Sequence, residues 1–226
     1  MLMEKERKEI VEYGKEMSVS GLTKGTAGNI SIYDSKTGYM AISPSGIGYN
    51  ETTPEDVVVM RLDGSVVEGD RKPSSEHDLH SAIYKLKPDM RSVVHTHSTY
   101  CVVMSCMNMP LKAVHYVLAD AGCFEVPVAP YCTYGTLELA EVVKETIGEG
   151  NAVLMANHGM LACGTSLKSA YGLAATCEWT AEIQWRCLAI GQPNVLNNEQ
   201  MNLVLEKFKG YGQKTKDDNE VKGYFG

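Results

Sequence analysis

The sequence predicts an α/β fold, a three-layer α/β/α sandwich whose central sheet is mainly antiparallel. Segments with helical periodicity alternate with short apolar runs typical of strands, and no linker or repeat interrupts them. Several strand-like runs are joined by short turns, which connect antiparallel neighbours in a sheet. The 226 residues suit one sizeable domain. We expect it to span residues 1–212, followed by a polar C-terminal tail at 213–226.

The predicted elements follow one another without long gaps. The first helix is expected at residues 4–19, where Ile10, Tyr13 and Met17 form an apolar stripe, and a second is expected to begin at about Ser75. Further helices are predicted at 100–107, 136–147, 166–190 and 199–208, with a brief capped helix at 52–57. Strands are predicted at 30–33, 39–42, 57–62, 92–96, 125–128, 152–157 and 160–163.

The charge and composition limit the classes of partner. A net charge of −7 without any dense Lys/Arg run argues against a nucleic-acid surface, although backbone amides can still bind a small anion. No apolar run is long enough to span a bilayer, and the N-terminus is charged from residue 4, unlike a signal peptide. Seven cysteines without a CxxC motif are typical of a reducing compartment. We therefore expect a cytoplasmic protein that binds neither nucleic acid nor membrane.

Three histidines and one glutamate form the strongest candidate site. His95 and His97 lie two residues apart on a predicted strand, so their side chains point to the same face. His158 follows another apolar run, and Glu76 adds a carboxylate. Imidazole nitrogens and carboxylate oxygens are ligands that zinc accepts. An isolated HxH pair is as often two ordinary histidines, but His158 and Glu76 favour a metal site.

Glu76 has two interpretations at this stage. It lies in the first turn of the predicted helix, behind the candidate N-caps Ser74 and Ser75, where a carboxylate commonly caps or stabilises the helix. Alternatively, it is a displaceable fourth zinc ligand that also transfers protons, which would leave three permanent ligands and an open position. His80, one turn later, could support such a site from behind the ligands.

Three loops rich in small residues are suited to bind phosphate. They are Gly25–Asn29 (GTAGN), Pro44–Gly46 (PSG) and the serine pair before Glu76. Their glycines allow close approach of the main chain to an anion, and their hydroxyl and amide side chains can donate hydrogen bonds. The chain contains neither a Walker loop nor a GxGxxG after a strand, so a nucleotide cofactor is not indicated.

In combination, these motifs resemble the class II sugar-phosphate aldolase/epimerase family. The motifs that carry the resemblance are, in chain order, GTAGNIS, SPSG, PSSEHDLH, VVHTHS, APYCTYGT, NHG and VLEKFKGYG, which together cover about residues 4–212. The resemblance implies a three-layer α/β/α enzyme with one Zn²⁺ per subunit and a small phosphorylated ketose as substrate. It also implies a cyclic homotetramer with active sites between subunits.

The resemblance further implies a role for each matching residue. His95, His97 and His158 would be zinc ligands, and Glu76 would bind zinc in the empty enzyme and act as acid/base once substrate displaces it. Tyr116 would enter a neighbouring subunit's site, and Tyr211 would lie near the substrate. The residues implied to contact the phosphate or line the substrate site are Thr26, Gly28, Asn29, Ser45, Gly46, Ser74, Ser75 and Tyr134.

The likeness within the family is greatest to enzymes that cleave L-fuculose 1-phosphate into dihydroxyacetone phosphate and lactaldehyde. Glu76 and Ser43 stand where the related L-ribulose-5-phosphate 4-epimerases carry Asp and Lys, which favours aldol cleavage. Asp120 and Ala27 depart from the fuculose aldolase pattern and leave room for another deoxyketose phosphate. A 4-epimerase is the other enzymatic alternative, and a non-catalytic adducin-like module would be expected to lack the histidines.

Overall fold

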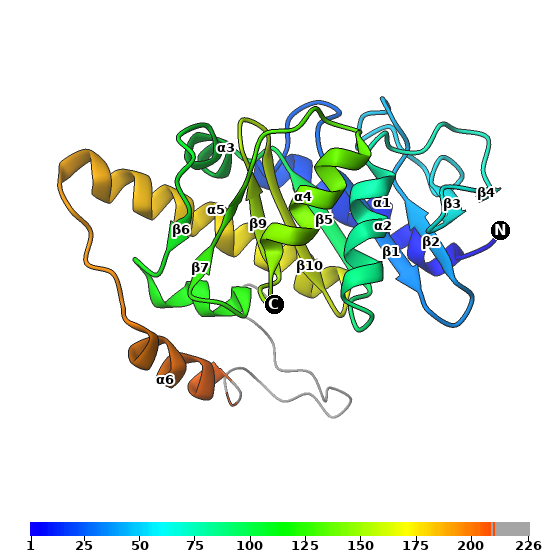
Figure 1. The fold of residues 1–226 in the computed structure, drawn as a ribbon. Coiled ribbons are helices and arrows are strands. Elements are labelled where there is room, and N and C mark those ends of the chain that lie inside the picture. The colour runs from blue at the N-terminus through cyan, green and yellow to red at the C-terminus, as the bar shows by residue number, and fades with distance from the viewer. Residues whose placement is uncertain (209, 211–226) are drawn as a thin grey trace.

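The computed structural model describes residues 1–208 and residue 210, and its centre is an eight-stranded sheet (Figure 1). The strand order is β4-β3-β2-β1-β5-β10-β9-β8. All neighbouring strands pair antiparallel except β8 and β9, which are parallel. The strands are β1 (Asn29–Asp34), β2 (Tyr39–Ile42), β3 (Val58–Arg61), β4 (Val66–Glu68), β5 (Ser92–Thr96), β8 (Val128–Ala129), β9 (Ala152–Met155) and β10 (Gly159–Gly164). The predicted α/β fold with a mainly antiparallel sheet is confirmed.

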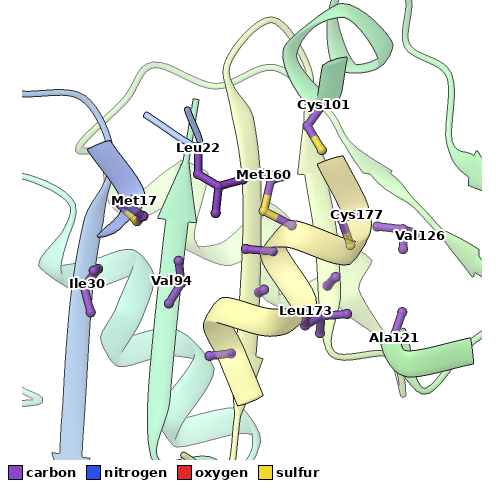
Figure 2. Packing of buried hydrophobic residues seen from close by; sticks show 14 of the residues in the cluster. Met17, Leu22, Ile30, Val94, Cys101, Ala121, Val126, Met160, Leu173 and Cys177 are labelled. Carbon is purple, nitrogen blue, oxygen red and sulfur yellow. The ribbon is translucent and has the colours of Figure 1, made fainter. Parts of the chain in front are cut away.

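Helices cover both faces of the sheet. One face carries α1 (Glu4–Ser20), α3 (Thr99–Cys106) and α5 (Leu167–Ile190), whereas α2 (His77–Leu86) and α4 (Leu137–Ile147) pack on the other (Figure 1). The strands alternate between two apolar cores: Val94 packs with the α5 side and Val93 with the α2 side. Figure 2 shows Val94 and Met160 beside Leu173 and Cys177 of α5.

The register of three central strands determines which face of the sheet carries the candidate site residues. His95 of β5 pairs with Asn29 of β1 on one side and with Leu161 of β10 on the other. Cross-strand partners point to the same face of a sheet. Leu161 belongs to the core beneath α2 and α4, so Asn29 and His95 face α2 as well.

Several predicted boundaries differ from the structure for identifiable reasons. The helix expected from Ser75 begins at His77, since Glu76 is its N-terminal flanking residue. The strand expected at 125–128 divides around Pro127: β7 (Glu125–Val126) pairs with β6 (Leu111–Lys112) in a separate sheet, and β8 joins the main sheet. Proline lacks the amide hydrogen that a continuous ladder would use.

The brief helix predicted at 52–57 is wrong. Those residues form turns, in which the Asp56 carboxylate accepts from the amide and hydroxyl of Thr53 and pairs with Arg71. Such side-chain bonds to nearby amides compete with helix formation. Short elements that the sequence analysis did not predict include β4, β6 and the 3₁₀ helix η1 (Tyr116–Ala121).

The end of the chain is described only in part. Helix α6 (Asn198–Phe208) agrees with the helix predicted at 199–208 and contacts η1. The predicted tail at 213–226 lies outside the described residues. Among the helices of residues 1–208, none is long and apolar enough to cross a membrane.

Candidate active site

The three predicted histidine ligands converge from two neighbouring segments. His95 is the second-last residue of the fully buried strand β5, His97 follows that strand, and His158 lies in the turn between β9 and β10. Candidate ligand nitrogens of the three rings all lie within 4.8 Å of one another. The Nε2 atoms of His95 and His97 are 3.0 Å apart. The spacing predicted from the HxH motif is therefore realised, with the third imidazole supplied by the adjacent hairpin.

The tight turn around His158 depends on its two neighbours. Asn157 adopts a left-handed conformation with φ of 57°, which asparagine tolerates better than most residues. On the other side, a Cβ at Gly159 would collide with the carbonyl oxygen of Thr96. The sequence Asn-His-Gly thus lets β10 approach β5 closely while His158 faces the other two histidines.

Glu76 points at this cluster, and its side chain does not cap α2. Its Oε2 lies 3.2 Å from His95 Nε2, and its Oε1 lies 3.4 Å from His158 Nε2. Asn29 Nδ2 donates a hydrogen bond of 2.9 Å to Oε2. The capping interpretation of Glu76 is therefore not supported, and the carboxylate completes a compact His3Glu arrangement.

The electrostatics of the cluster favour a bound cation. Burial disfavours charge on His95, yet the adjacent Glu76 carboxylate outweighs burial and raises the pKa of His95. Burial likewise opposes ionisation of Glu76, but His95, His158 and Asn29 hold its pKa well below the ordinary range. Burial and the charge of His95 lower the pKa of His97 to about 4 and that of His158 to about 3. His97 and His158 are thus neutral beside an ionised carboxylate, as metal binding requires, whereas His95 would give up its Nε2 proton when a cation binds.

The hydrogen bonds of the ligands also fit a divalent ion. His95 Nδ1 lies 2.8 Å from the carbonyl oxygen of Met160, so Nδ1 carries the proton and Nε2 presents its lone pair to the cluster. Within the described part of the chain, Glu76 Oε1 is buried without a hydrogen-bond partner. Three imidazole nitrogens and a carboxylate oxygen are a donor set typical of zinc. Glu76, His95, His97 and His158 could therefore hold Zn²⁺ together.

A cavity of about 350 Å³ opens beside the cluster. It is lined by Glu76, His97 and His158, and every residue predicted to contact the phosphate or line the substrate site also borders it. These are Thr26, Gly28, Asn29, Ser45, Gly46, Ser74, Ser75 and Tyr134. The rest of the lining consists of Ala27 and Pro44, which belong to two of the predicted phosphate loops, and of Tyr131, Cys132 and Asn157, for which the sequence indicated no role in the site.

Backbone contacts hold the three loops predicted to bind phosphate close together. Ser74 N donates to Ser43 O, and Ser45 N donates to Lys72 O, which aligns the PSG loop antiparallel to the serine pair. The GTAGN loop rests against β5, where a Cβ at Gly28, whose φ is +73°, would lie 2.5 Å from the His95 carbonyl oxygen. Glycine is therefore required there both for conformation and for space.

The predicted tyrosines differ in position. Tyr134 borders the cavity, whereas Tyr116 lies on η1, is 40% exposed and is not among the residues that line the cavity. Its ring contacts His115 and Phe208, with centroids 4.5 and 6.3 Å away. Tyr211 lies outside the described residues.

Comparison with known proteins identifies the family. The model of the family described as "Class II Aldolase and Adducin N-terminal domain" matches residues 8–185. The chain belongs to this class II aldolase and adducin family.

Two relatives and one solved structure of this family are similar to the chain along nearly its whole length. The chain is 48% identical over 213 residues to a "5-deoxy-D-ribulose 1-phosphate aldolase" of Bacillus thuringiensis serovar kurstaki, which covers 94% of this chain and 100% of that protein. It is 40% identical over 206 residues to an "L-fuculose phosphate aldolase" of Escherichia coli K12, covering 91% and 94% of the two chains. A solved structure described as "L-fuculose 1-phosphate aldolase" superposes with a TM-score of 0.90 at 42% identity, covering 92% of this chain and 98% of that one.

Proposed function

We propose that this protein is a zinc-dependent aldolase that cleaves 5-deoxyribulose 1-phosphate reversibly into dihydroxyacetone phosphate and acetaldehyde. The observation that carries the proposal is the 48% identity to a 5-deoxy-D-ribulose 1-phosphate aldolase along that relative's whole length. The proposal replaces the sequence-based expectation of L-fuculose 1-phosphate as the leading substrate. It keeps the class of reaction, which is cleavage of the C3–C4 bond of a deoxyketose 1-phosphate.

His95, His97 and His158 would hold the divalent ion, with Glu76 as the ligand that substrate displaces. When bound, Zn²⁺ would act as a Lewis acid for the negative charge that develops on the ketone oxygen. Breaking the C3–C4 bond requires a base that removes the proton of the C4 hydroxyl, which becomes the aldehyde oxygen, and an acid that supplies a proton to C3. Glu76 would supply the proton to C3, and Tyr116 of a neighbouring subunit would handle that of the hydroxyl. The Glu76 carboxylate suits this role because it is buried, ionised and directed into the cavity beside His97 and His158.

The phosphate would bind to the three small-residue loops. Hydroxyl groups of Thr26, Ser45 and Ser74 and nearby main-chain amides supply donors. Of the described residues that line the cavity, none is Lys or Arg, and Glu76 is the single carboxylate. A phosphate beside that carboxylate would be repelled without positive charge nearby, so the charge balance of the cavity supports the metal assignment.

Tyr116 would act on a neighbouring subunit's substrate, within a cyclic homotetramer. The exposed aromatic ring on η1 and its absence from the described lining of its own cavity support a role across a subunit boundary. Tyr134 would form part of the wall near the substrate.

L-fuculose 1-phosphate is the second candidate substrate, favoured by the TM-score of 0.90 to a fuculose 1-phosphate aldolase. The two ketoses share the carbons that become dihydroxyacetone phosphate and differ in the aldehyde that is released. One gives acetaldehyde, and the other gives lactaldehyde. The choice therefore depends on the part of the cavity that accepts the aldehyde, beyond the metal and phosphate contacts.

A panel of ketose phosphates tests both candidates. The zinc-loaded protein is incubated with 5-deoxyribulose 1-phosphate, fuculose 1-phosphate and ribulose 5-phosphate, and dihydroxyacetone phosphate and the aldehydes are measured. We expect the highest kcat/KM for 5-deoxyribulose 1-phosphate and no epimerisation of ribulose 5-phosphate. His97→Ala is the control, and it should lose zinc and activity together. A higher kcat/KM for fuculose 1-phosphate would reverse the order of the candidates, and full activity of His97→Ala would refute the metal assignment.

A further inference from the structure

A buried row of polar side chains runs from Glu76 into the interior between α2 and the sheet. Asn29 Nδ2 donates to Glu76 Oε2 over 2.9 Å, and the Asn29 Oδ1 lies 2.5 Å from His80 Nε2. His80 Nδ1 lies 2.7 Å from Ser31 Oγ, which lies 2.7 Å from the hydroxyl of Tyr84. His80 is fully buried, and the other members are buried as well. The row is continuous from the carboxylate to Tyr84.

The carboxylate end of the row sets the direction of the hydrogen bonds from Glu76 as far as Ser31, whereas the Tyr84 hydroxyl can turn to either the Oγ or the carbonyl oxygen of Ser31. A carboxylate accepts, so the amide group of Asn29 must turn its NH₂ toward Glu76 and its oxygen toward His80. The oxygen of Asn29 then needs a proton on His80 Nε2. A neutral imidazole with its proton on Nε2 has a bare Nδ1, which accepts from the hydroxyl of Ser31.

Reversing either of the two hydrogen bonds of Asn29 would place two acceptors face to face. If Asn29 flipped, its oxygen would oppose the Glu76 carboxylate. If the proton of His80 moved to Nδ1, its Nε2 lone pair would oppose the oxygen of Asn29. A buried polar group without a partner costs about 1–3 kcal/mol, so one arrangement is strongly preferred. Burial also lowers the pKa of His80 to about 3, which keeps the ring neutral.

We propose that His80 is a positioning residue: through Asn29, it holds the Glu76 carboxylate aimed at the substrate cavity. This inference rests on the proposed function, in which Glu76 transfers the proton. His80 itself is absent from the described lining of the cavity, so it acts through Asn29 without touching substrate. The row also restricts Asn29, because its oxygen is occupied by His80 and one of its two amide hydrogens by Glu76. A single N–H remains for a ligand in the cavity.

The position of the row explains why Glu76 needs it. The carboxylate lies 3.2 Å from His95 and 3.4 Å from His158, and the described residues give its Oε1 no hydrogen-bond partner. If substrate took the place of Glu76 at a bound metal, Asn29 would be the neighbour that keeps Oε2 in place. Partners of this kind, behind metal ligands, typically contribute 10–100-fold to affinity or activity, as an order of magnitude.

The first test reads the proton position without any turnover. Long-range ¹H–¹⁵N correlation of the histidine rings is recorded for the zinc-free and the zinc-loaded protein, with His80→Gln used to assign the His80 signals. We expect the proton of His80 on Nε2 in both states. A proton on Nδ1, or on both nitrogens at neutral pH, would overturn the proposal. This result is independent of substrate, so it stands even if no tested ketose phosphate is cleaved.

The second test measures turnover, zinc content and phosphate affinity of variants. His80→Leu should lower kcat by roughly 10–100-fold while zinc content and the Kd for inorganic phosphate stay at the wild-type level. His80→Gln, which can still donate to Asn29, should recover much of the lost kcat. Ser81→Ala, at a buried neighbour on the same helix, is the matched control and should retain wild-type kcat.

Two outcomes separate positioning from packing. Wild-type kcat in a folded His80→Leu variant would refute the proposal. If His80→Leu fails to fold, two other measurements decide: the kcat of His80→Gln and the position of the His80 proton in the wild-type protein. A kcat of His80→Gln as low as that of Glu76→Gln would also refute the proposal. Lack of cleavage by the wild-type protein would instead count against the proposed function.

Discussion

Removing the carboxylate of Glu178 should destabilise the protein through helix α3, which begins two residues after His97. Glu178 lies on α5 and reaches the first turn of α3. Its Oε1 and Oε2 accept from the amide of Tyr100 at 2.9 and 3.1 Å, and its Oε2 accepts from the amide of Cys101 at 2.9 Å. The first amides of a helix have no partner within the helix, so Glu178 supplies one from outside. We expect Glu178→Gln to weaken this connection and Glu178→Ala to remove it.

The expected loss of unfolding free energy follows from two backbone donors and one helix terminus. A hydrogen bond to a charged group contributes about 1.5–3 kcal/mol when its partner is buried, and a negative charge at a helix N-terminus adds about 0.3–1 kcal/mol. Cys101 is fully buried, so its amide cannot be rehydrated without local opening. These contributions sum to about 3–7 kcal/mol, and because Glu178 itself is only half-buried, Glu178→Ala should lower the free energy of unfolding by the lower end of that range, about 3 kcal/mol. Glu178→Gln retains one acceptor oxygen and should lower it by about half as much.

Urea denaturation at a fixed protein concentration measures the effect, because the stability of an oligomer depends on concentration. Glu182→Gln is the matched control: Glu182 lies one turn later on α5 and forms an ion pair with Arg186 at the protein surface. Such exposed pairs contribute at most about 1 kcal/mol. Glu178→Ala with the same unfolding midpoint as Glu182→Gln would refute the reasoning, since it would mean that the amides of α3 need no external acceptor.

Further predictions concern the site itself. Glu76→Gln should lower kcat by roughly two to four orders of magnitude while phosphate binding survives, as judged by titration with inorganic phosphate; retained turnover would remove Glu76 from the acid/base role. Mixing Tyr116→Phe subunits with Glu76→Gln subunits should restore part of the activity if the two residues meet across a subunit boundary, and no recovery after verified subunit exchange would argue against that arrangement. Gly28→Ala should destabilise the GTAGN loop by about 1–3 kcal/mol, because φ is +73° and the new Cβ would lie 2.5 Å from the His95 carbonyl oxygen; an unchanged melting temperature would contradict this. Dialysis against a chelator should abolish cleavage and zinc addition should restore it, whereas cleavage by the metal-free protein would exclude the metal mechanism.

The shared face of His95 and His97 was predictable because it depends on a local pattern: residues two apart on one strand point to the same side. His158 joins them through the pairing of β10 with β5, a contact between distant segments that a local pattern does not give. The loops predicted to bind phosphate were also visible as small-residue segments, and all three border the cavity. For the histidine pair and the loops, the signal lies within a few consecutive residues. The resemblance to known enzymes added the order of these segments along the chain.

Other features could not be predicted because they depend on contacts between distant segments. Tyr131 and Cys132 border the cavity only because the segment after β8 folds back toward Ser75, where a Cβ on Gly135 would lie 3.0 Å from the Ser75 carbonyl oxygen. Short elements such as β6 and β7 consist of two residues each, too few for a periodic signal. The choice between the two candidate ketoses likewise depends on the walls of the cavity that would accept the aldehyde, beyond the proposed metal and phosphate contacts.

The strand register connects the predicted ligands with the unpredicted positioning row. His95 and Asn29 are paired across β5 and β1, and Ser31 lies two residues further along β1 on the same face. Helix α2 crosses this face and brings Glu76, His80 and Tyr84 over Asn29 and Ser31. The spacing of four residues between these three positions is one helical turn each, so a single helix face supplies the proposed proton-transfer group and its support. A slip of one residue in β1 would turn Asn29 and Ser31 toward α5 and separate the row from the proposed metal ligands. The register of β1 against β5 is therefore a precondition for the contact between Asn29 and the Glu76 carboxylate.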